Sequence, residues 1–172
     1  MKKIMATFVL CMSVMSQAYA LPEKLKADYP DLEKVGESSY YFFFVHVYNI
    51  NLYQVKNAPE LEALDIKYSR DLTAKRRLEK AMEDLEDQGK YSKEKLKEWE
   101  KQMATIFPNV KEGDTITIFK NESLNTEFYH NNNYRGFIDD PEFTEAFMGI
   151  WLGEKPANAK MKRDLTKDAF HP

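Results

Sequence analysis

The stretch DPEFTEAFMGIWLG, residues 140–153, decides the fold because it predicts one complete helix with an aromatic face. Asp140 can accept hydrogen bonds from free backbone N–H groups of the first turn, and Pro141 has no N–H to leave unpaired. Gly153 is expected to supply the left-handed residue that ends the helix. Large apolar residues recur at the spacing of one helical face, at Phe143, Phe147, Ile150 and Trp151. This face must pack on another layer, which we expect to be a β-sheet.

Alternation of apolar and polar residues predicts the strands of that sheet. Residues 40–53 are rich in aromatic and β-branched residues and contain no proline, so we expect one long strand after Gly36. Both faces of its first half are apolar, which predicts cover on both sides. Further strands are expected at residues 64–69, 114–119, 126–130 and 134–138. The last two should form a hairpin through Asn131, Asn132 and Asn133, since asparagine tolerates positive φ.

Two amphipathic helices are expected between these groups of strands. Thr73 can cap the first, which should end at Gly89, and Ser92 can cap the second, which should end before Pro108. Lys and Glu crowd the opposite face of both helices, and Arg76-Arg77 is interpreted as part of that solvated face. Strands grouped on either side of a helical pair predict an α+β fold, with a large antiparallel sheet covered on one face by a layer of helices.

The beginning of the chain predicts export. Lys2 and Lys3 precede an apolar run, and Ala18-Tyr19-Ala20 fits the small-x-small cleavage rule, so residues 1–20 are interpreted as a signal peptide. Cys11 raises the alternative of a lipoprotein signal, but Leu10 before it is not the small residue that such processing needs. After residue 20 no stretch approaches the roughly 20 apolar residues of a membrane helix. We expect an exported protein, most naturally in the periplasm of a Gram-negative bacterium.

The remaining chain is expected to form one domain. Residues 21–35 are interpreted as a polar lead-in and residues 36–172 as the domain, which contains no cysteine and must be stabilised by its core. Two of the 25 basic residues lie in the signal peptide, so the formal charge falls from −3 to −5. An acidic chain without a basic patch argues against nucleic acid as a partner. No cofactor is indicated, and the oligomeric state is left open.

Few residues point to a site. His46 could act as a general base, and Tyr48, Tyr53 and Asn51 offer polar tips on an apolar strand that could orient a ligand. Arg70 is a candidate for an anionic group, with an ion pair to Asp71 as the alternative. The histidines His46, His130 and His171 are scattered, so no metal site is predicted. The chain also lacks a nucleophile elbow, a glycine-rich phosphate loop and a paired-carboxylate motif.

Several motifs follow one another in order along the chain: Val47-Tyr48 to Leu52-Tyr53, the strand from Leu64 to Arg70 followed by the Thr73 helix, Phe107-Pro108 leading to Lys111-Glu112-Gly113-Asp114, the hairpin before Gly136, and Ile150-Trp151-Leu152-Gly153. Taken together, they make residues 35–167 resemble the chalcone isomerase-like family, specifically its short exported bacterial branch. The resemblance implies an open-faced β-sandwich, a large antiparallel sheet with helices over one side. This agrees with the class expected from periodicity.

The residues of this chain match the family's fold better than they match the site residues of its plant enzymes. Plant members of this family close a flavanone ring and use an arginine in the long-strand region to hold the anion, whereas fatty-acid-binding members use the cleft between sheet and helices as a lipid pocket. Here the chain between Gly36 and Tyr53 has no arginine, and Tyr48 stands where the plant enzymes have a threonine. Losing a comparable oxyanion donor costs about 3 to 4 kcal/mol. Chalcone cyclisation is therefore disfavoured.

Three functions follow as hypotheses. The leading one is a non-catalytic exported protein that binds a small apolar or amphipathic ligand, such as a fatty acid, between sheet and helices. The second is an isomerase or lyase acting on a phenolic or enone compound, with His46 or Tyr48 in proton transfer. The third is a periplasmic protein-interaction module whose cleft is filled by its own side chains.

Overall fold

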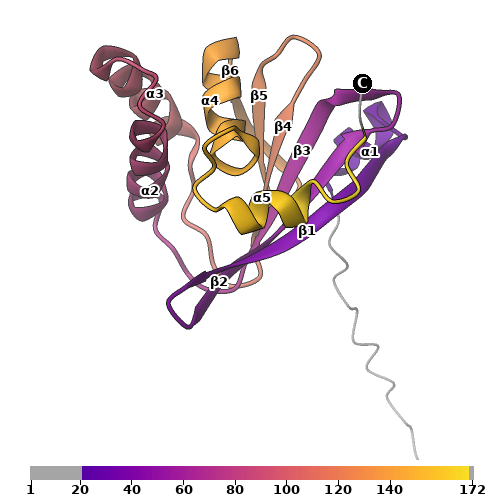
Figure 1. Cartoon of the computed structure of the whole chain (residues 1–172), viewed down its shortest axis with the longest axis horizontal. Coiled ribbons are helices and arrows are strands. Elements are labelled where there is room, and N and C mark those ends of the chain that lie inside the picture. The colour runs from indigo at the N-terminus through magenta and orange to yellow at the C-terminus, as the bar shows by residue number, and fades with distance from the viewer. Residues whose placement is uncertain (1–20, 171–172) are drawn as a thin grey trace, which may run out of the picture.

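Six strands form one antiparallel sheet in the computed structural model, which describes residues 21–170 (Figure 1). They are β1 (Leu32–Phe42), β2 (Val45–Val55), β3 (Ala58–Tyr68), β4 (Thr115–Lys120), β5 (Thr126–His130) and β6 (Asn133–Ile138). Each strand pairs with the strand before it in the chain, so the order is β1-β2-β3-β4-β5-β6. The predicted α+β class and open-faced sheet are confirmed. The predicted signal peptide, residues 1–20, lies outside the described residues.

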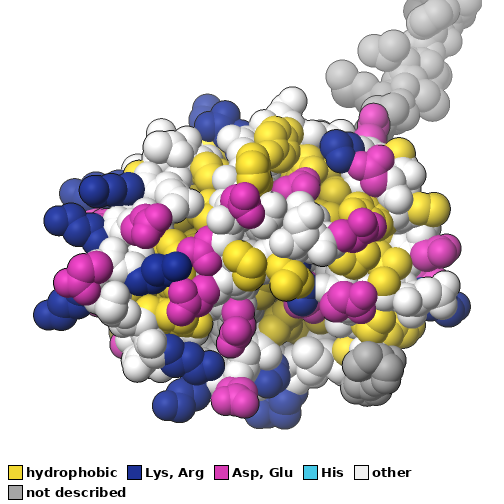
Figure 2. Space-filling view, turned by 90° about the horizontal axis from the view of Figure 1, so that it is seen from above, with side chains coloured by type: hydrophobic (Ala, Val, Ile, Leu, Met, Phe, Trp, Pro, Cys, Tyr) yellow, Lys and Arg dark blue, Asp and Glu magenta, His cyan; other side chains and the backbone are white. Residues whose placement is uncertain are grey.

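Four helices cover one face of this sheet (Figure 1). They are α2 (Ala74–Asp87) and α3 (Lys93–Ile106), inserted between β3 and β4, and α4 (Pro141–Leu152) and α5 (Ala159–Leu165), which follow β6. Thr73 and Ser92 cap α2 and α3 as predicted, each accepting a backbone N–H at 3.2 Å. Seen from above, Lys and Arg side chains gather on the side of α2 and α3 among Asp and Glu (Figure 2). None of the helices within residues 21–170 has the length and apolar character to cross a bilayer.

The main core lies between the sheet and these helices. Trp99 of α3 is fully buried, and its ring meets Phe143 of α4 edge to face with 5.5 Å between the centroids. Phe143, Phe147 and Ile150 are buried as predicted, and α4 packs on β5. Asp140 accepts the N–H groups of Glu142 and Phe143 at 2.9 and 3.3 Å, which confirms the predicted cap.

Gly153 ends α4 for a different reason from the predicted one. Its φ of −66° and ψ of 177° are extended rather than left-handed. A Cβ at this position would lie 2.7 Å from the backbone oxygen of Gly149, closer than real contacts allow. Glycine is therefore required here because the backbone folds back tightly on the last helical turn.

The long strand predicted over residues 40–53 is wrong, because this segment is a hairpin. β1 ends at Phe42 and β2 begins at Val45, with Phe43 and Phe44 forming the turn between them. The predicted cover on both sides is also absent, since Phe44 is 99% exposed. The sequence does not indicate this turn because neither Phe43 nor Phe44 is a residue that usually forms turns. Phe43 nevertheless adopts a positive φ of 55°.

Residues 21–35, predicted as a polar lead-in, contain regular secondary structure that the sequence pattern does not indicate. It contains α1 (Glu23–Asp28) and the beginning of β1. Leu21 and Leu25 are buried against Ala63, Phe119 and Tyr129, which project from the opposite face to the main core. We call this opposite side the outer face. The short helix α1 therefore covers part of the outer face.

Candidate functional site

Three tyrosines stand side by side where the sheet meets the helices. Tyr40 of β1 pairs with Tyr48 of β2, which pairs with Tyr68 of β3, and all three pack on the main core. The Tyr40 and Tyr48 rings are stacked with centroids 5.1 Å apart, and the Tyr48 and Tyr68 rings meet edge to face at 6.0 Å. We call Tyr40, Tyr48 and Tyr68 the tyrosine row. Its three rings form one continuous aromatic cluster, and the hydroxyl groups of Tyr48 and Tyr68 meet side chains of the helices.

Two side chains from the helices donate hydrogen bonds to hydroxyl groups of the tyrosine row. The indole Nε1 of Trp151 in α4 donates to the hydroxyl of Tyr48 at 3.2 Å. Arg77 of α2 donates through Nε to the hydroxyl of Tyr68 at 3.0 Å and through Nη1 to the backbone oxygen of Pro108 at 2.9 Å. Its guanidinium carbon lies 5.1 Å from the Tyr68 ring centroid and 4.9 Å from that of Phe107. The interpretation of Arg77 as a solvated helix residue is therefore wrong, because its head group is held at the sheet.

The electrostatics of the tyrosine row favour a neutral Tyr48 phenol, and the cationic side chain of Arg77 lies beside the row. Burial raises the pKa of the Tyr48 hydroxyl above its ordinary value, with nearby Asp84 adding to the effect and the Trp151 hydrogen bond opposing it. Burial also raises the pKa of Asp84, which pairs with Lys80 at 2.8 Å. An arginine stays protonated at any ordinary pH. Tyr48 is thus poorly suited to act as a base, whereas Arg77 can hold an anion.

The structure separates His46 from Tyr48. A bulge between Tyr40 and Tyr41 makes Tyr41 pair with His46, so Val47 is the extra residue and the alternation of β2 shifts. His46 Nε2 lies 3.0 Å from the Oδ1 of Asn49, and its ring stacks on Tyr41 at 4.8 Å. Strict alternation along residues 40–53 predicts that His46 shares the face of Tyr48, and this prediction is wrong because His46 lies on the outer face.

The other predicted site residues do not gather around Tyr48 either. Asn51 and Tyr53 lie on the outer face, and both line a groove of about 960 Å³ whose lining also includes side chains of β1 and α5. Alternation through Leu64, Ile66 and Tyr68 predicts that Arg70 lies on the buried face, and this prediction is wrong because Arg70 follows the end of β3 and is exposed. Asp71 accepts the backbone N–H of Glu112 at 2.9 Å. Of the five predicted site residues, Tyr48 alone lies on the face of the sheet that the helices cover.

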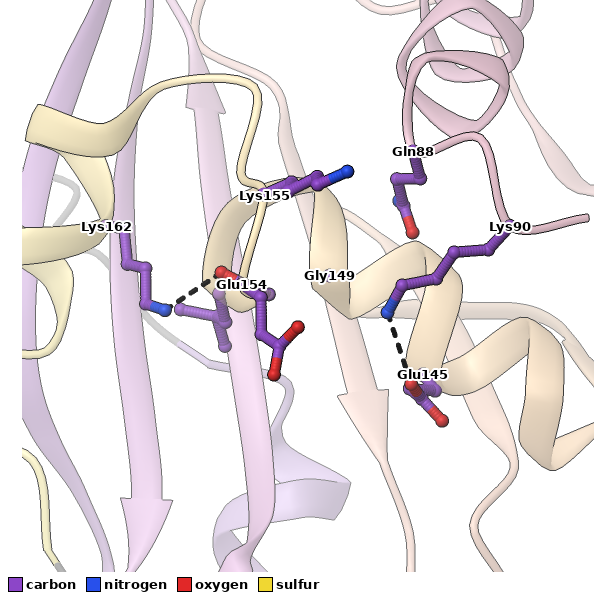
Figure 3. Close-up of a pocket in the computed structure, with 9 residues that line it drawn as sticks. Gln88, Lys90, Glu145, Gly149, Glu154, Lys155 and Lys162 are labelled. Carbon is purple, nitrogen blue, oxygen red and sulfur yellow. Dashed lines mark hydrogen bonds and ion pairs between the residues drawn. The ribbon is translucent and has the colours of Figure 1, made fainter.

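A second hollow of about 320 Å³ opens between the end of α2 and α4 (Figure 3). Lys90 reaches Glu145 across it at 3.9 Å, and Lys162 donates to the backbone oxygen of Gly153 at 2.8 Å. Lys155 and Glu154 extend along its rim (Figure 3). Such a charged lining does not suit an apolar chain. Within residues 21–170, no three His, Cys, Asp or Glu side chains are arranged to hold a metal ion.

Asp65 of β3 is a buried carboxyl on the outer face. Its Oδ1 accepts from the hydroxyl of Thr117 at 2.7 Å, while its buried Oδ2 has no hydrogen-bond partner. Burial raises its pKa to about 6, and the Thr117 hydrogen bond opposes this shift. Alternation along residues 64–69 puts Asp65 on the polar face of its strand and gives no sign that the folded protein buries it completely.

We expect Asp65→Asn to stabilise the protein at pH 7.5 and to have little effect at pH 4. The raised pKa means that the folded state holds a proton more tightly than the unfolded state, so the free energy of unfolding falls as pH rises from about 4 to 6. Removing this titration should recover about 1 to 3 kcal/mol above pH 6. Urea unfolding at both pH values measures it, with exposed Asp31→Asn as the control. A gain that is equal at both pH values would contradict the account.

Comparisons with known proteins agree with this architecture. The sequence profile of the chalcone isomerase-like family matches residues 14–166. The crystal structure of a fatty-acid binding protein from Arabidopsis thaliana superimposes with a TM-score of 0.68 at 12% identity, covering 81% of this chain and 88% of that one. No curated protein sequence matches the chain. Because the family profile spans most of its length, the chain belongs to the chalcone isomerase-like family.

Proposed function

We propose that the protein is exported and binds a small apolar or amphipathic molecule, such as a fatty acid, where the tyrosine row meets α2 and α4. The position of Arg77 carries this proposal. Its head group is half-buried between the rings of Tyr68 and Phe107, where a carboxylate would find a fixed positive charge. The family arginine missing from the strand is replaced, in this proposal, by one supplied from the helix.

The tyrosine row suits an amphipathic molecule in two ways. Its stacked rings offer apolar surface for an acyl chain, and its hydroxyl groups and Arg77 offer donors for the head group. The rings meet closely, so the chain would enter by parting Trp151 from Tyr48. That step breaks one neutral hydrogen bond, which is worth about 1 kcal/mol. Burial of the acyl chain can offset this cost.

Two further observations support the proposal. The structure of similar fold from Arabidopsis thaliana is that of a fatty-acid binding protein. Export, with the periplasm as the destination, is inferred from the charged start, apolar run and cleavage motif of residues 1–20. Cell fractionation and the mass of the purified protein test export directly, because removal of residues 1–20 would begin the mature chain at Leu21.

Lipid extraction of the purified protein, followed by mass spectrometry, tests the ligand class. We expect fatty acids or related amphipathic molecules to be recovered in amounts close to that of the protein. Titration of delipidated protein with a fluorescent fatty acid then gives the affinity. Protein that is repeatedly empty and does not bind the probe would overturn the proposal in favour of an interaction module with a filled cleft.

Arg77→Gln should weaken fatty-acid binding by about 10- to 100-fold, the value of a charge-assisted hydrogen bond. Arg76→Gln makes the same chemical change one residue away on an exposed position and should leave the affinity unchanged. A fatty alcohol of the same length has no charge to lose and should bind both variants alike. Arg77→Lys keeps the charge and should retain part of the affinity. Equal losses in the Arg76 and Arg77 variants would contradict the assignment.

Catalysis is the alternative that the geometry favours least. His46 and Tyr48 lie on opposite faces of the sheet and cannot act together on one substrate. Burial also keeps the Tyr48 hydroxyl protonated. Incubation with a panel of chalcones measures this alternative, and turnover that falls in Tyr48→Phe would replace the binding proposal with an isomerase.

A further inference from the structure

The turn between β1 and β2 exposes more apolar surface than a surface turn normally does. Phe42, Phe43 and Phe44 are 60%, 82% and 99% exposed, and Tyr41 and Val45 beside them are also exposed. We call residues 41–45 the aromatic tip. A contiguous exposed apolar patch on a protein surface marks a site of interaction with another molecule. The aromatic tip is such a patch, concentrated in five consecutive residues.

The backbone at Phe43 of the aromatic tip is also unfavourable for a bulky residue. Phe43 adopts a φ of 55°, a conformation that bulky residues rarely take and that glycine or asparagine would accept easily. Its ring meets that of Phe42 edge to face, with centroids 4.8 Å apart, and most of its surface is exposed. Both the backbone strain and the exposure would disappear with an ordinary turn sequence. Segments that break local rules in this way occur where function requires them.

The aromatic tip has the shape and charge of an element that enters a membrane surface. It projects beyond the helices at the end of two eleven-residue strands (Figure 1). From Ser38 to Val55 the chain has no Asp, Glu, Lys or Arg. Phenylalanines occupy the turn and Tyr41 lies behind them, and tyrosine is enriched where protein meets the headgroup region of a bilayer. An uncharged aromatic projection complements a lipid interface and would not be drawn to it by anionic lipid.

A second copy of the chain is a poorer occupant. Complete burial of the aromatic tip would cover roughly 600 Å², given the area of an aromatic side chain, whereas a stable interface needs about 800 Å² from each partner. A projecting tip also needs a complementary apolar hollow on the partner. The two hollows described above are lined largely by charged and polar side chains, Lys90, Glu145 and Lys155 in one and Lys34 and Glu37 in the other. Neither could receive a phenylalanine ring without desolvating these groups.

We propose that the aromatic tip inserts into the interfacial region of a lipid bilayer and docks the protein reversibly on a membrane surface. The inference stands on the exposure, backbone strain and lack of charge of the tip, and it holds whether or not the tyrosine row binds a fatty acid. The tip lies next to Tyr40 along β1, so docking would bring the tyrosine row close to the membrane.

Flotation with phosphatidylcholine vesicles tests the proposal. The purified protein should float with vesicles, and replacing both Phe43 and Phe44 with serine should weaken binding at least about 10-fold. Phe137→Ser removes an exposed phenylalanine from β6 and should change nothing. Adding phosphatidylglycerol, or raising salt tenfold, should also leave binding unchanged. All forms are compared with the same N-terminus, established by mass, because residues 1–20 are themselves apolar.

Three outcomes would overturn the proposal. The first is a protein that does not float with vesicles, and the second is a double serine variant that floats as well as the original protein. The third is a concentration-dependent dimer in sedimentation that the double variant abolishes while vesicles capture neither form, which would assign the tip to a second copy. Phe44→Trp adds a direct readout, since insertion should shift the new tryptophan emission to shorter wavelength in the presence of vesicles.

Discussion

Gly36→Ala should destabilise the protein by about 3 kcal/mol or more, because α5 crosses β1 in contact with this glycine. An added Cβ would lie 1.8 Å from the backbone oxygen of Leu165 and 2.4 Å from its carbonyl carbon. Both atoms belong to backbone, so the clash cannot be relieved by rotating a side chain. Overpacking a core costs about 1 to 3 kcal/mol, and here the whole helix must move. Met161 and Leu165, which are buried in the core by α5, would lose part of their contacts.

Urea unfolding followed by circular dichroism measures this effect, and Gly149→Ala is the matched control. Gly149 lies within α4, and a Cβ there would meet the side chain of Gln88 at an ordinary 3.7 Å. Alanine in a helix interior is favoured over glycine by about 1 kcal/mol, so Gly149→Ala should be neutral or stabilising. Hydrogen exchange should show that Gly36→Ala loosens α5 first. A Gly36→Ala protein as stable as the original, with α5 still protected, would refute the prediction.

Asp140→Ala should cost about 2 to 5 kcal/mol because this side chain joins two helices. One carboxylate oxygen caps α4, and the other accepts the indole N–H of Trp99 at 2.9 Å and pairs with Lys95 at 2.9 Å. Loss of a cap costs about 1 to 2 kcal/mol, and leaving the N–H of a buried tryptophan unpaired costs about 1 to 3 kcal/mol more. Asp140→Asn keeps an acceptor oxygen and should cost less than Asp140→Ala.

Ser92→Ala separates the capping part of this effect from the tertiary part. The Ser92 hydroxyl accepts the backbone N–H of Lys95 at 3.2 Å and caps α3. Ser92→Ala should therefore lower the free energy of unfolding by about 1 kcal/mol. An Asp140→Ala variant that loses no more stability than Ser92→Ala would show that the Trp99 contact is dispensable.

The stabilisation that Asp140 provides also depends on pH. Partial burial opposes ionisation of Asp140, but hydrogen bonds from Trp99 and Lys95 outweigh it and lower its pKa, so its stabilisation is present above pH 4 and is lost as pH falls through the lowered value.

Local signals made α2, α3, α4 and the last hairpin predictable. Thr73, Ser92 and Asp140 cap their helices through bonds to residues two or three positions away, which sequence spacing reveals directly. Asn131 and Asn132 adopt the positive φ expected of them. The β1–β2 hairpin was missed because Phe43 and Phe44 form a turn without any turn-forming residue. Its aromatic composition is indistinguishable from that of a buried strand.

The arrangement of the candidate site could not be predicted because it depends on tertiary contacts. Nothing in the helical pattern distinguishes Arg77, which reaches Tyr68, from the exposed Arg76 before it. Helical spacing places Trp151 on the face that packs on the core, but it does not show that the indole N–H donates to Tyr48 of β2. A single bulge at Val47 moved His46 to the outer face, and strict alternation cannot anticipate such an inserted residue.

The contact between α5 and β1 imposes an order on folding during synthesis. The β-sheet grows by pairing each new strand with its predecessor, so most of it can assemble as the chain appears. β1, however, remains without its covering helix until residues 159–165 have been made, and the segment after α5 adds hydrogen bonds from Asp168 to Val35 and from Phe170 to Gln54. A nascent chain that stops before α5 would thus hold a nearly complete sheet whose first strand is unprotected. Such an intermediate is a natural target for chaperones and a point at which folding can be diverted into aggregation.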